Sequence, residues 1–444
     1  MKKTKYIYHI LNIIFILGCI KAGAQYSQIQ YLRPNDKNGL NKFESGKQDT
    51  VPFDGLKVRI GGNFSQDFQG LRNHNNAQSV IVDGVNQNLP AHLTNGFNLA
   101  MANLNIDVQL ADGIRMNLTT YLSTRHHQDT WVKGGYIQFD KLLFLNNDWV
   151  NKLMKNLTLK VGDFEVDYGD AHFRRTDGGN SIYNPFVENY ILDAFATEIG
   201  GEIYYHANNG IFIMGGVTNG VLDPSVTKPT KIDSATGETN HSGAAFHGKI
   251  GYDKQLTSDF RFRLTGSFYT DKSSPSNTLY WGDRAGSHYF LVMENTSADA
   301  SDNAWSGRLN PNFSEEVHSF MINPFIKYKG LELFGTGEII KGRAITETDN
   351  RQATQWAGDI IYRFPANKEN FWIGARYNTV KAELSGIEDK VTVNRAVGSI
   401  GWFMTKNIML KGEYVSQKYN HFPSDDLRSG GKFNGFMIEA SVGF

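Results

Sequence analysis

The last segment of the chain alternates between apolar and polar residues in a way that few folds accommodate. Apolar residues occupy every second position from Phe436 to Phe444, and the residues between them include Glu439. Successive side chains of a β-strand point to opposite faces, so one face of this strand is apolar while the other carries a charge. A strand between lipid and water fits this pattern, although an amphipathic strand of a soluble sandwich would show the same alternation.

The alternation recurs along the chain in runs of about ten residues, the length that a tilted strand needs to cross a bilayer. In one run, Phe260, Phe262 and Leu264 alternate with Arg261 and Arg263. The spacing of the runs predicts sixteen strands, at 56–69, 97–110, 113–124, 131–140, 157–168, 196–206, 210–218, 243–253, 259–270, 318–328, 331–341, 353–364, 371–380, 392–404, 407–418 and 433–444. An eighteen-stranded alternative stays open, because 287–296 and 305–314 would add one further pair.

The links between the runs alternate between short turns and longer loops, as they do in transmembrane barrels. For example, the tight turn 404–407 is followed after one strand by the loop 420–431. Helical periodicity is confined to 141–156, where we expect a short helical connection. The chain is therefore predicted to be all-β, a transmembrane antiparallel up-and-down β-barrel over residues 56–444.

The first 24 residues are typical of a secretory signal peptide that is cleaved on export. Three lysines precede a short apolar core at 10–20, and Ala-Gly-Ala at 22–24 offers a cleavage site. A retained anchor helix and lipidation at Cys19 remain alternatives. Residues 25–55 are polar and carry Pro34 and Pro52, so we expect a periplasmic N-terminal segment or one that enters the lumen.

Composition limits the classes of function. Cleavage after residue 24 removes four lysines, the single cysteine and no acid, so 45 basic and 45 acidic side chains become 41 and 45. The mature chain then forms no disulfide, and its near-neutral charge gives no reason to expect nucleic acid as a partner. The mean hydropathy of −0.40 agrees with a transmembrane barrel, because the apolar lipid-facing residues and the polar lumen-facing residues of such a barrel offset each other in the mean.

Two regions resemble Gram-negative outer-membrane porins of the general and phosphate-selective kinds. The last strand resembles the one that the barrel-assembly machinery reads, which assigns the assembly signal to Phe436, Ile438, Val442 and Phe444. Residues 160–164 resemble the strand that leads into the third extracellular loop of sixteen-stranded porins, which folds inward and narrows the pore. By that resemblance the loop 169–195 forms the constriction, with Asp170, His172, Arg174, Arg175, Asp177 and Glu188 facing the pore.

Placing the apolar face of each strand against lipid assigns its polar face to the lumen. The resulting pore wall includes Lys160, Arg261, Arg263, Arg363 and Arg376. The same rule places Arg115, Asp107 and other charges of both signs inside, with bases slightly outnumbering acids. A barrel of sixteen strands leaves an aqueous channel, and its wall alone barely favours either sign of charge. His172, Arg174 and Arg175 lie close together in the third loop, flanked by Asp170 and Asp177, and charges at the narrowest point dominate, so we expect a weak preference for anions.

The sequence thus predicts an outer-membrane porin that admits small hydrophilic solutes or ions by diffusion, with no cofactor, metal or catalytic residue. HExxH, Walker and GxSxG motifs are absent, so no enzyme activity is expected. Two alternatives remain: a structural or secretion-associated barrel whose lumen is occluded by 25–55 or 271–317, and an outer-membrane hydrolase. The expected partners are outer-membrane lipid, permeant solutes, the assembly machinery and, by analogy with porins, two further copies in a homotrimer.

Overall fold

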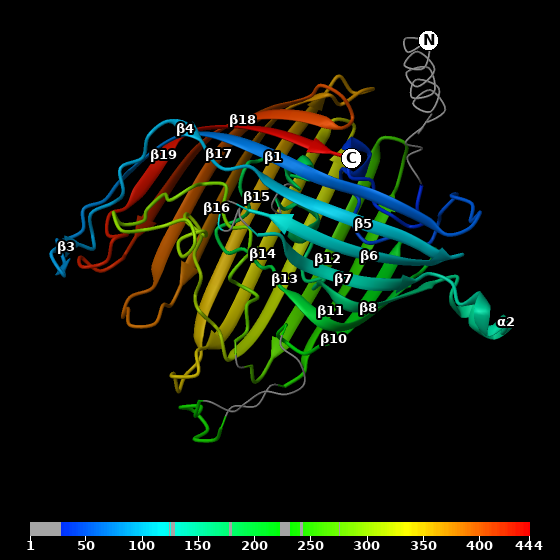
Figure 1. Ribbon diagram of the computed structural model, residues 1–444, viewed down its shortest axis with the longest axis horizontal. Helices are drawn as coiled ribbons and strands as arrows, with labels where there is room; N and C mark the ends of the chain where they lie inside the picture. The colour runs from blue at the N-terminus through cyan, green and yellow to red at the C-terminus, as the bar shows by residue number, and fades with distance from the viewer. Residues whose placement is uncertain are drawn as a thin grey trace, which may run out of the picture.

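The computed structural model describes residues 28–123, 125, 129–176, 180–222, 231–239, 243–274 and 276–444. Sixteen long strands and the short strand β4 (Gly96–Phe97) form one sheet (Figure 1). The long strands are β1 (Lys57–His74), β5 (Met101–Ala111), β6 (Ile114–Leu122), β7 (Trp131–Phe139), β8 (Leu157–Glu165), β9 (Thr197–His206), β10 (Ile211–Thr218), β11 (Ala245–Gln255), β12 (Phe260–Asp271), β13 (Glu316–Tyr328), β14 (Leu331–Arg343), β15 (Arg351–Phe364), β16 (Phe371–Ala382), β17 (Val391–Phe403), β18 (Ile408–Asn420) and β19 (Lys432–Gly443). A separate hairpin of β2 (Ile81–Val82) and β3 (Val85–Asn86) lies in the loop after β1.

The sheet is a closed barrel because its first and last strands pair. From β5 to β19 each strand is antiparallel to the next, and β1 pairs with β5 on one side and with β19 on the other. The β1–β19 register runs from Asn63 opposite Gly443 to His74 opposite Lys432. All sixteen predicted strands overlap those of the structure, and 287–296 and 305–314 form no strand. The predicted fold class is therefore confirmed, and the eighteen-stranded alternative is wrong.

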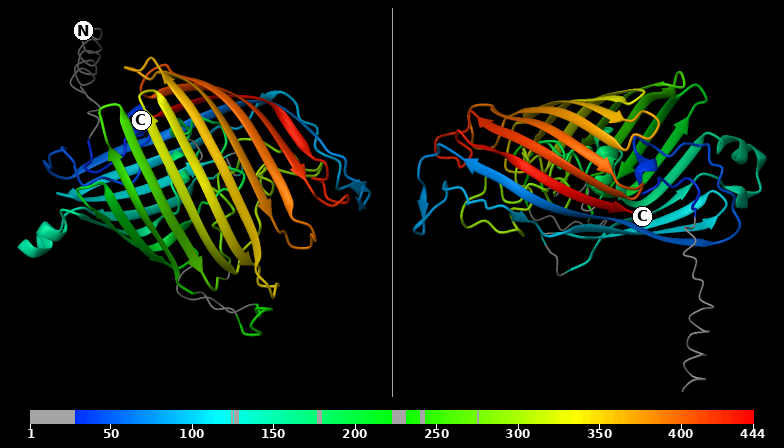
Figure 2. Two further views of the ribbon diagram at one scale, coloured as in Figure 1. Left: turned by 180° about the vertical axis from the view of Figure 1, so that it is seen from behind. Right: turned by 90° about the horizontal axis from the view of Figure 1, so that it is seen from above.

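Short and long links alternate around the barrel, as predicted. Turns such as 207–210, 256–259 and 404–407 lie at one end, the turn end, together with the longer β7–β8 link, and the other long connections lie at the opposite end, the loop end (Figure 2). The β7–β8 link contains the 3₁₀ helix η2 (Leu143–Leu145) and the helix α2 (Asp148–Leu153), where the sequence predicts a helical connection. Asn147 caps α2, because its Oδ1 accepts from the N–H of Trp149 at 3.0 Å.

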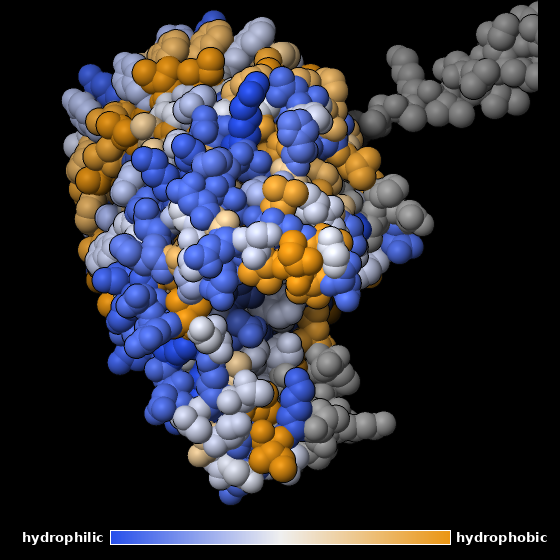
Figure 3. All heavy atoms as spheres, turned by 90° about the vertical axis from the view of Figure 1, so that its left-hand side faces the viewer, coloured by the Kyte–Doolittle hydropathy of each residue, from blue (hydrophilic) through white to orange (hydrophobic). Residues whose placement is uncertain are grey.

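The outer face of the barrel is apolar. On β15, Trp356 and Ile360 are 58% and 52% exposed, whereas the alternate residue Ile361 is fully buried. Near the turn end, aromatic rings on three neighbouring strands stack at centroid distances of 5.8 to 6.2 Å: Tyr362, Phe364, Phe371 and Trp402. Such a ring of aromatic side chains marks the border of a lipid-facing band. The loop end, which faces the viewer in Figure 3, is mostly hydrophilic.

Residues 28–55, the N-terminal segment, lie across the turn end and reach into the lumen. The N–H of Lys37, in the 3₁₀ helix η1 (Lys37–Gly39), donates to the carbonyl of Lys406 at 2.8 Å. Further in, Asn41 Nδ2 donates to Glu332 Oε1 on β14 at 2.6 Å. The expected signal peptide, 1–24, lies outside the described residues. In the part of the chain that is described, no helix is long and apolar enough to cross a membrane.

The hydrophobic core lies inside the barrel. Two connections fold into the lumen: the inner loop, described at residues 166–176 and 180–196 between β8 and β9, and the long loop, described at residues 272–274 and 276–315 between β12 and β13. Their apolar side chains pack with inward residues of the wall in one cluster that includes Phe186, Val187, Ile191, Leu192, Tyr289, Val292, Val380, Val393 and Val415. Water-filled space is therefore confined to what these loops leave open.

The position of the apolar band predicts how the barrel responds to charge on its outer face. Ile360 lies between Trp356 and Tyr362 on β15, so Ile360→Arg should lower the free energy of unfolding by about 2–4 kcal/mol, the cost of an arginine near the bilayer midplane. Thr354→Arg, nearer the loop end of the same strand, should cost about 0–1 kcal/mol. Denaturant unfolding in lipid vesicles measures both. Equal effects of the two variants would contradict the assignment of the band.

Candidate functional site

The inner loop crosses the lumen and is held on the opposite wall by its own backbone. The N–H of Val187 donates to Glu413 Oε2 on β18, and the N–H of Ile191 donates to Asn378 Oδ1 on β16, both at 2.7 Å. Acceptors on charged or amide side chains fix the path of a segment that has no strand partner. The loop thus reaches from β8 to the far side of the barrel.

The entry into the inner loop depends on a glycine. Gly169 has a φ of +72°, and a Cβ at this position would lie 2.2 Å from the sulfur of Met321 on β13. Its N–H donates to Ser267 Oγ on β12 at 2.9 Å. The chain then continues through two 3₁₀ helices, η3 (Ala171–Arg174) and η4 (Ser181–Tyr183). Only glycine combines this backbone conformation with so close an approach to the wall.

Most of the residues predicted to face the constriction are buried. Four of them are at most 5% exposed: Asp170, Arg174, Arg175 and Glu188. Three form ion pairs at 2.6 to 2.7 Å, namely Asp170 with Arg263, Arg175 with Asp193, and Glu188 with Arg308. These charges fasten the inner loop to the wall, to itself and to the long loop. Each of the four charges is enclosed with a partner or an aromatic ring, and their role at a pore constriction stays a prediction.

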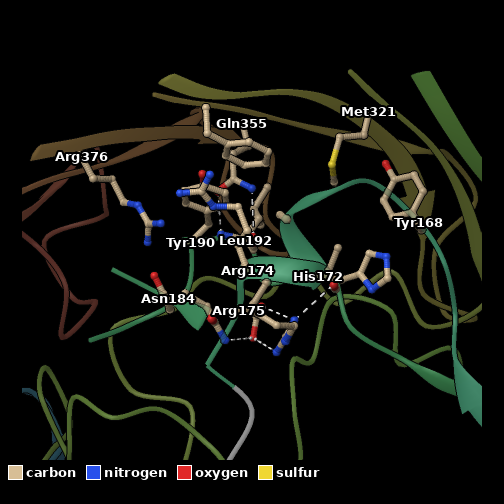
Figure 4. A pocket seen from close by; sticks show the side chains of 15 residues that line it. Tyr168, His172, Arg174, Arg175, Asn184, Tyr190, Leu192, Met321, Gln355 and Arg376 are labelled. Atoms are coloured by element: carbon tan, nitrogen blue, oxygen red, sulfur yellow. Dashed lines mark hydrogen bonds and ion pairs between the residues drawn. The ribbon is translucent and has the colours of Figure 1, made fainter. Parts of the chain in front are cut away.

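Arg174 borders a small cavity between the inner loop and the wall. Figure 4 shows it with Arg376, which comes from β16, and Gln355, which comes from β15. The guanidinium of Arg174 lies 4.7 Å from the centre of the Phe334 ring. The cavity measures about 20 Å³, room for about one water molecule. A solute of several atoms does not fit there.

The larger open space lies on the other side of the inner loop, along the wall from β5 to β8. Two adjoining cavities of about 300 and 190 Å³ share wall residues on β5, β6 and β7 and residues of the β8 end and inner loop. The shared residues include Asn105, Asn117, Thr119, Tyr136, Glu165 and Asn180. These two adjoining cavities, which together we call the side channel, are the candidate functional site.

Among the predicted constriction residues that the structure describes, His172 borders the side channel. Its Nε2 lies 2.8 Å from Asp167 Oδ1, and its Nδ1 lies 3.4 Å from Glu165 Oε1. Burial lowers the pKa of His172, but the hydrogen bonds and charges of these two carboxylates outweigh burial and raise it to about 9. The imidazole is therefore charged at neutral pH. Asp177 lies outside the described residues.

Two arginines give the side channel its unpaired positive charge. Most neighbouring charges are paired, as Lys160 is with Glu202 at 3.0 Å. Within the described part of the chain, Arg33 and Arg115 form no ion pair. Arg33 donates to backbone carbonyls and stacks on an aromatic ring, and Arg115 donates to Gln138 Oε1 at 2.6 Å. Both guanidinium groups border the larger cavity.

The five residues predicted for the pore wall all lie on the inner face, and each is paired with an acid. The pairs are Lys160 with Glu202, Arg261 with Asp253, Arg263 with Asp170, Arg363 with Glu332, and Arg376 with Asp359. Of the five, Lys160 borders the side channel and Arg376 borders the small cavity. The wall charges thus hold the filled lumen together more than they line open water.

The residues predicted as an assembly signal lie on the outer face of β19. Phe436, Ile438 and Phe444 are 43% to 46% exposed, and Val442 is half-buried. Between them, Met437 and Glu439 point inward and are buried. The role of these four residues in assembly stays a prediction.

One group of side chains has the composition of a metal site. His288 Nδ1, from the long loop, lies 2.6 Å from Asp67 Oδ2 on β1 and 3.5 Å from Glu439 Oε2 on β19. The ammonium of Lys411 lies 2.8 Å from the other oxygen of Glu439. The ammonium of Lys411 and the imidazole of His288, whose pKa burial lowers but the two carboxylates raise overall to about 9, together balance the charges of Asp67 and Glu439. The arrangement therefore fits an ionic link between the long loop and the β1–β19 seam.

The alternation in the sequence places Arg115 on the inner wall but does not distinguish it from the other inward charges. It does not identify Arg33 or the amide side chains as residues of the side channel. The signal for the amides was present. In the run Asn103-Leu104-Asn105-Ile106, the apolar residues face outward and the amides inward. Alternation assigned the face correctly, but only the fold shows which inward residues remain in contact with open space.

No family model matches the sequence, and no curated protein matches it. Among solved structures, the outer membrane channel DcaP of Acinetobacter baumannii superposes with a TM-score of 0.50 at 11% identity, covering 88% of this chain and 98% of that one. The chain shares the barrel fold of that channel. An anion-selective porin from Comamonas acidovorans (TM-score 0.48, 9% identity, 88% and 100% covered) and OmpT of Vibrio cholerae (0.47, 9%, 89% and 99%) are also similar.

The raised pKa of His172 predicts that the start of the inner loop loosens at alkaline pH. A histidine whose folded pKa of about 9 exceeds the ordinary value of 6.5 stabilises the fold fully below pH 6.5, and the contribution is lost as pH rises through 9. Hydrogen exchange of the backbone amides at 168–174 should therefore accelerate between pH 6.5 and 9, beyond the intrinsic increase. His172→Gln should abolish this extra dependence; a wild-type profile identical to that of the variant would contradict the assignment.

Proposed function

We propose that this protein is an outer-membrane porin, a passive diffusion channel for small hydrophilic solutes or ions. The observation that carries the proposal is the side channel, a pair of adjoining cavities lined by many polar side chains between the inner loop and the wall from β5 to β8. The closed barrel supplies the membrane span, and the inner loop narrows the lumen without filling this side of it. Neighbouring copies in a homotrimer would be compatible with such a barrel.

The proposed channel prefers anions weakly. Most charges along it cancel in ion pairs. Among the described residues without an ion pair, Arg33 and Arg115 add two positive charges to the larger cavity and Asp163 adds one negative charge to the smaller cavity. A narrow channel with low-dielectric walls focuses such a field, although screening over about 8 Å at physiological salt limits its reach. This small positive excess therefore biases the passage of ions without excluding cations.

Conductance measurements in planar lipid bilayers test both the proposed diffusion channel and its proposed preference for anions. The purified protein should give stepwise conductance, and reversal potentials in a KCl gradient should indicate an anion-to-cation permeability ratio above one. In Arg33→Gln/Arg115→Gln that ratio should fall to one or below, because the unpaired positive charge is removed. Lys418→Gln, which removes an exposed charge from the outer face of β18, should leave it unchanged. Cation preference in the wild type would overturn the proposed selectivity.

A second candidate function is a barrel whose lumen stays closed. The observation that favours it is the extent to which the inner loop, the long loop and the N-terminal segment occupy the lumen. A folded barrel, recognised by heat-modifiable migration in detergent gels, that gives no conductance would favour this candidate over the porin.

A further inference from the structure

Uncharged polar side chains line the side channel on three neighbouring strands. Asn63 on β1 stands opposite Asn103 on β5, and Asn105 on β5 stands opposite Thr119 on β6. Residues two apart on a strand share a face, so these side chains and Asn117 all point into the barrel. Together Asn63, Asn103, Asn105, Asn117 and Thr119 form what we call the amide stripe, and all five border the cavity of about 190 Å³.

Several amide atoms around this cavity have no hydrogen-bond partner within the protein. Among the described residues, Oδ1 of Asn63, Oδ1 of Asn180 and Nδ2 of Asn35 are unpaired. Asn63 belongs to the wall and is 4% exposed, whereas Asn180 belongs to the inner loop and Asn35 to the N-terminal segment. Unpaired buried polar atoms are costly unless water or a solute satisfies them. The three residues that carry these atoms border one cavity from the wall, the inner loop and the N-terminal segment.

The rest of the cavity lining adds acceptors, and its charges are paired except for the carboxylate of Asp163, which forms no ion pair among the described residues. Lys133 is paired with Asp283 at 2.9 Å, and Glu165 lies beside the charged His172. Asp163 Oδ1 is a further acceptor without a hydrogen-bond partner among the described residues. A solute in this cavity therefore meets many short-range hydrogen-bonding groups, and the two arginines of the proposed anion preference belong to the lining of the adjoining larger cavity.

We propose that the amide stripe favours neutral, hydroxyl-rich solutes of about the size of a monosaccharide. The inference rests on the proposed channel function and adds its solute class. An amide side chain both donates and accepts hydrogen bonds, as does each hydroxyl group, so such a solute replaces its lost water contacts at successive positions. A solute with few hydroxyl groups leaves the amides unpaired, and an ion loses hydration without gaining a counter-charge.

Swelling of proteoliposomes that contain the purified full-length protein tests the inference. The probes are glucose and tetraethylene glycol, two neutral solutes of similar mass, of which glucose carries five hydroxyl groups and the glycol two. Wild-type vesicles should swell several-fold faster in glucose than in the glycol, after subtraction of protein-free vesicles. Potassium chloride conductance of the same preparation is recorded in parallel, so that failure of the channel and failure of the selectivity are distinguishable.

Two double variants locate the effect. Thr119 Oγ1 donates to Asn105 Oδ1 at 2.8 Å inside the barrel, and Thr379 Oγ1 donates to Asn394 Oδ1 at 2.7 Å on the outer face. Asn105→Leu/Thr119→Val should lower the glucose-to-glycol rate ratio at least threefold. Asn394→Leu/Thr379→Val removes the same groups from the outside and should leave the ratio unchanged.

The outcomes separate clearly. Equal wild-type rates for glucose and the glycol, with normal conductance, overturn the inference and leave the porin standing. The same follows if the inner variant slows both solutes equally, because the stripe then acts only through pore width. Absence of conductance and of swelling overturns the proposed function itself. Because the wild-type comparison needs no substitution, the inference stays testable even if the inner variant fails to fold.

Discussion

The structure depends on the pairing of backbone N–H and C=O groups at the seam between β1 and β19. Hydrocarbon offers no hydrogen-bond partner, so a sheet can cross it only if no edge is left open. Here the seam is staggered: β1 uses residues 63–74 to pair with β19 and residues 57–65 to pair with β5. At the turn end, Phe444 and Gly62 extend the pairing through two backbone hydrogen bonds of 2.9 and 3.0 Å. Such stagger tilts the strands of a closed barrel.

Closure alone would leave a wide lumen, and the side chains of the wall determine where it is filled. The strands β12 to β18 present long charged or amide side chains inward, and Arg263, Asn378 and Glu413 bind the inner loop. The wall from β5 to β7 presents shorter side chains, such as Asn105 and Thr119, among longer ones such as Arg115. Because the inner loop is fastened to the far wall, open space remains where the wall offers few anchors.

The sequence predicts the barrel well and the site poorly, for a physical reason. Strand faces follow from two-residue alternation, which is local, so Arg363 and Ile360 were assigned to the correct sides of β15. Constriction residues depend on which acid each base of a loop meets across the lumen. Nothing near Arg175 in the sequence indicates that Asp193 will enclose it, or that Arg308 will reach Glu188 from the long loop.

This same pairing explains why a barrel with so many inward charges is proposed to select ions weakly. A buried charge is stable only with a partner, so filling the lumen with loops consumes charges in pairs such as Arg376 with Asp359. The field in the side channel is then set by the few cations that bind carbonyl or amide oxygens instead, namely Arg33 and Arg115. A count of all charged residues on the wall therefore overstates the ion selectivity of the channel, because a wall charge in an ion pair is cancelled by its partner at short range. Uncharged amide and hydroxyl groups need no partner of opposite charge, so they remain available to distinguish among uncharged solutes. This is the role that we propose for the amide stripe.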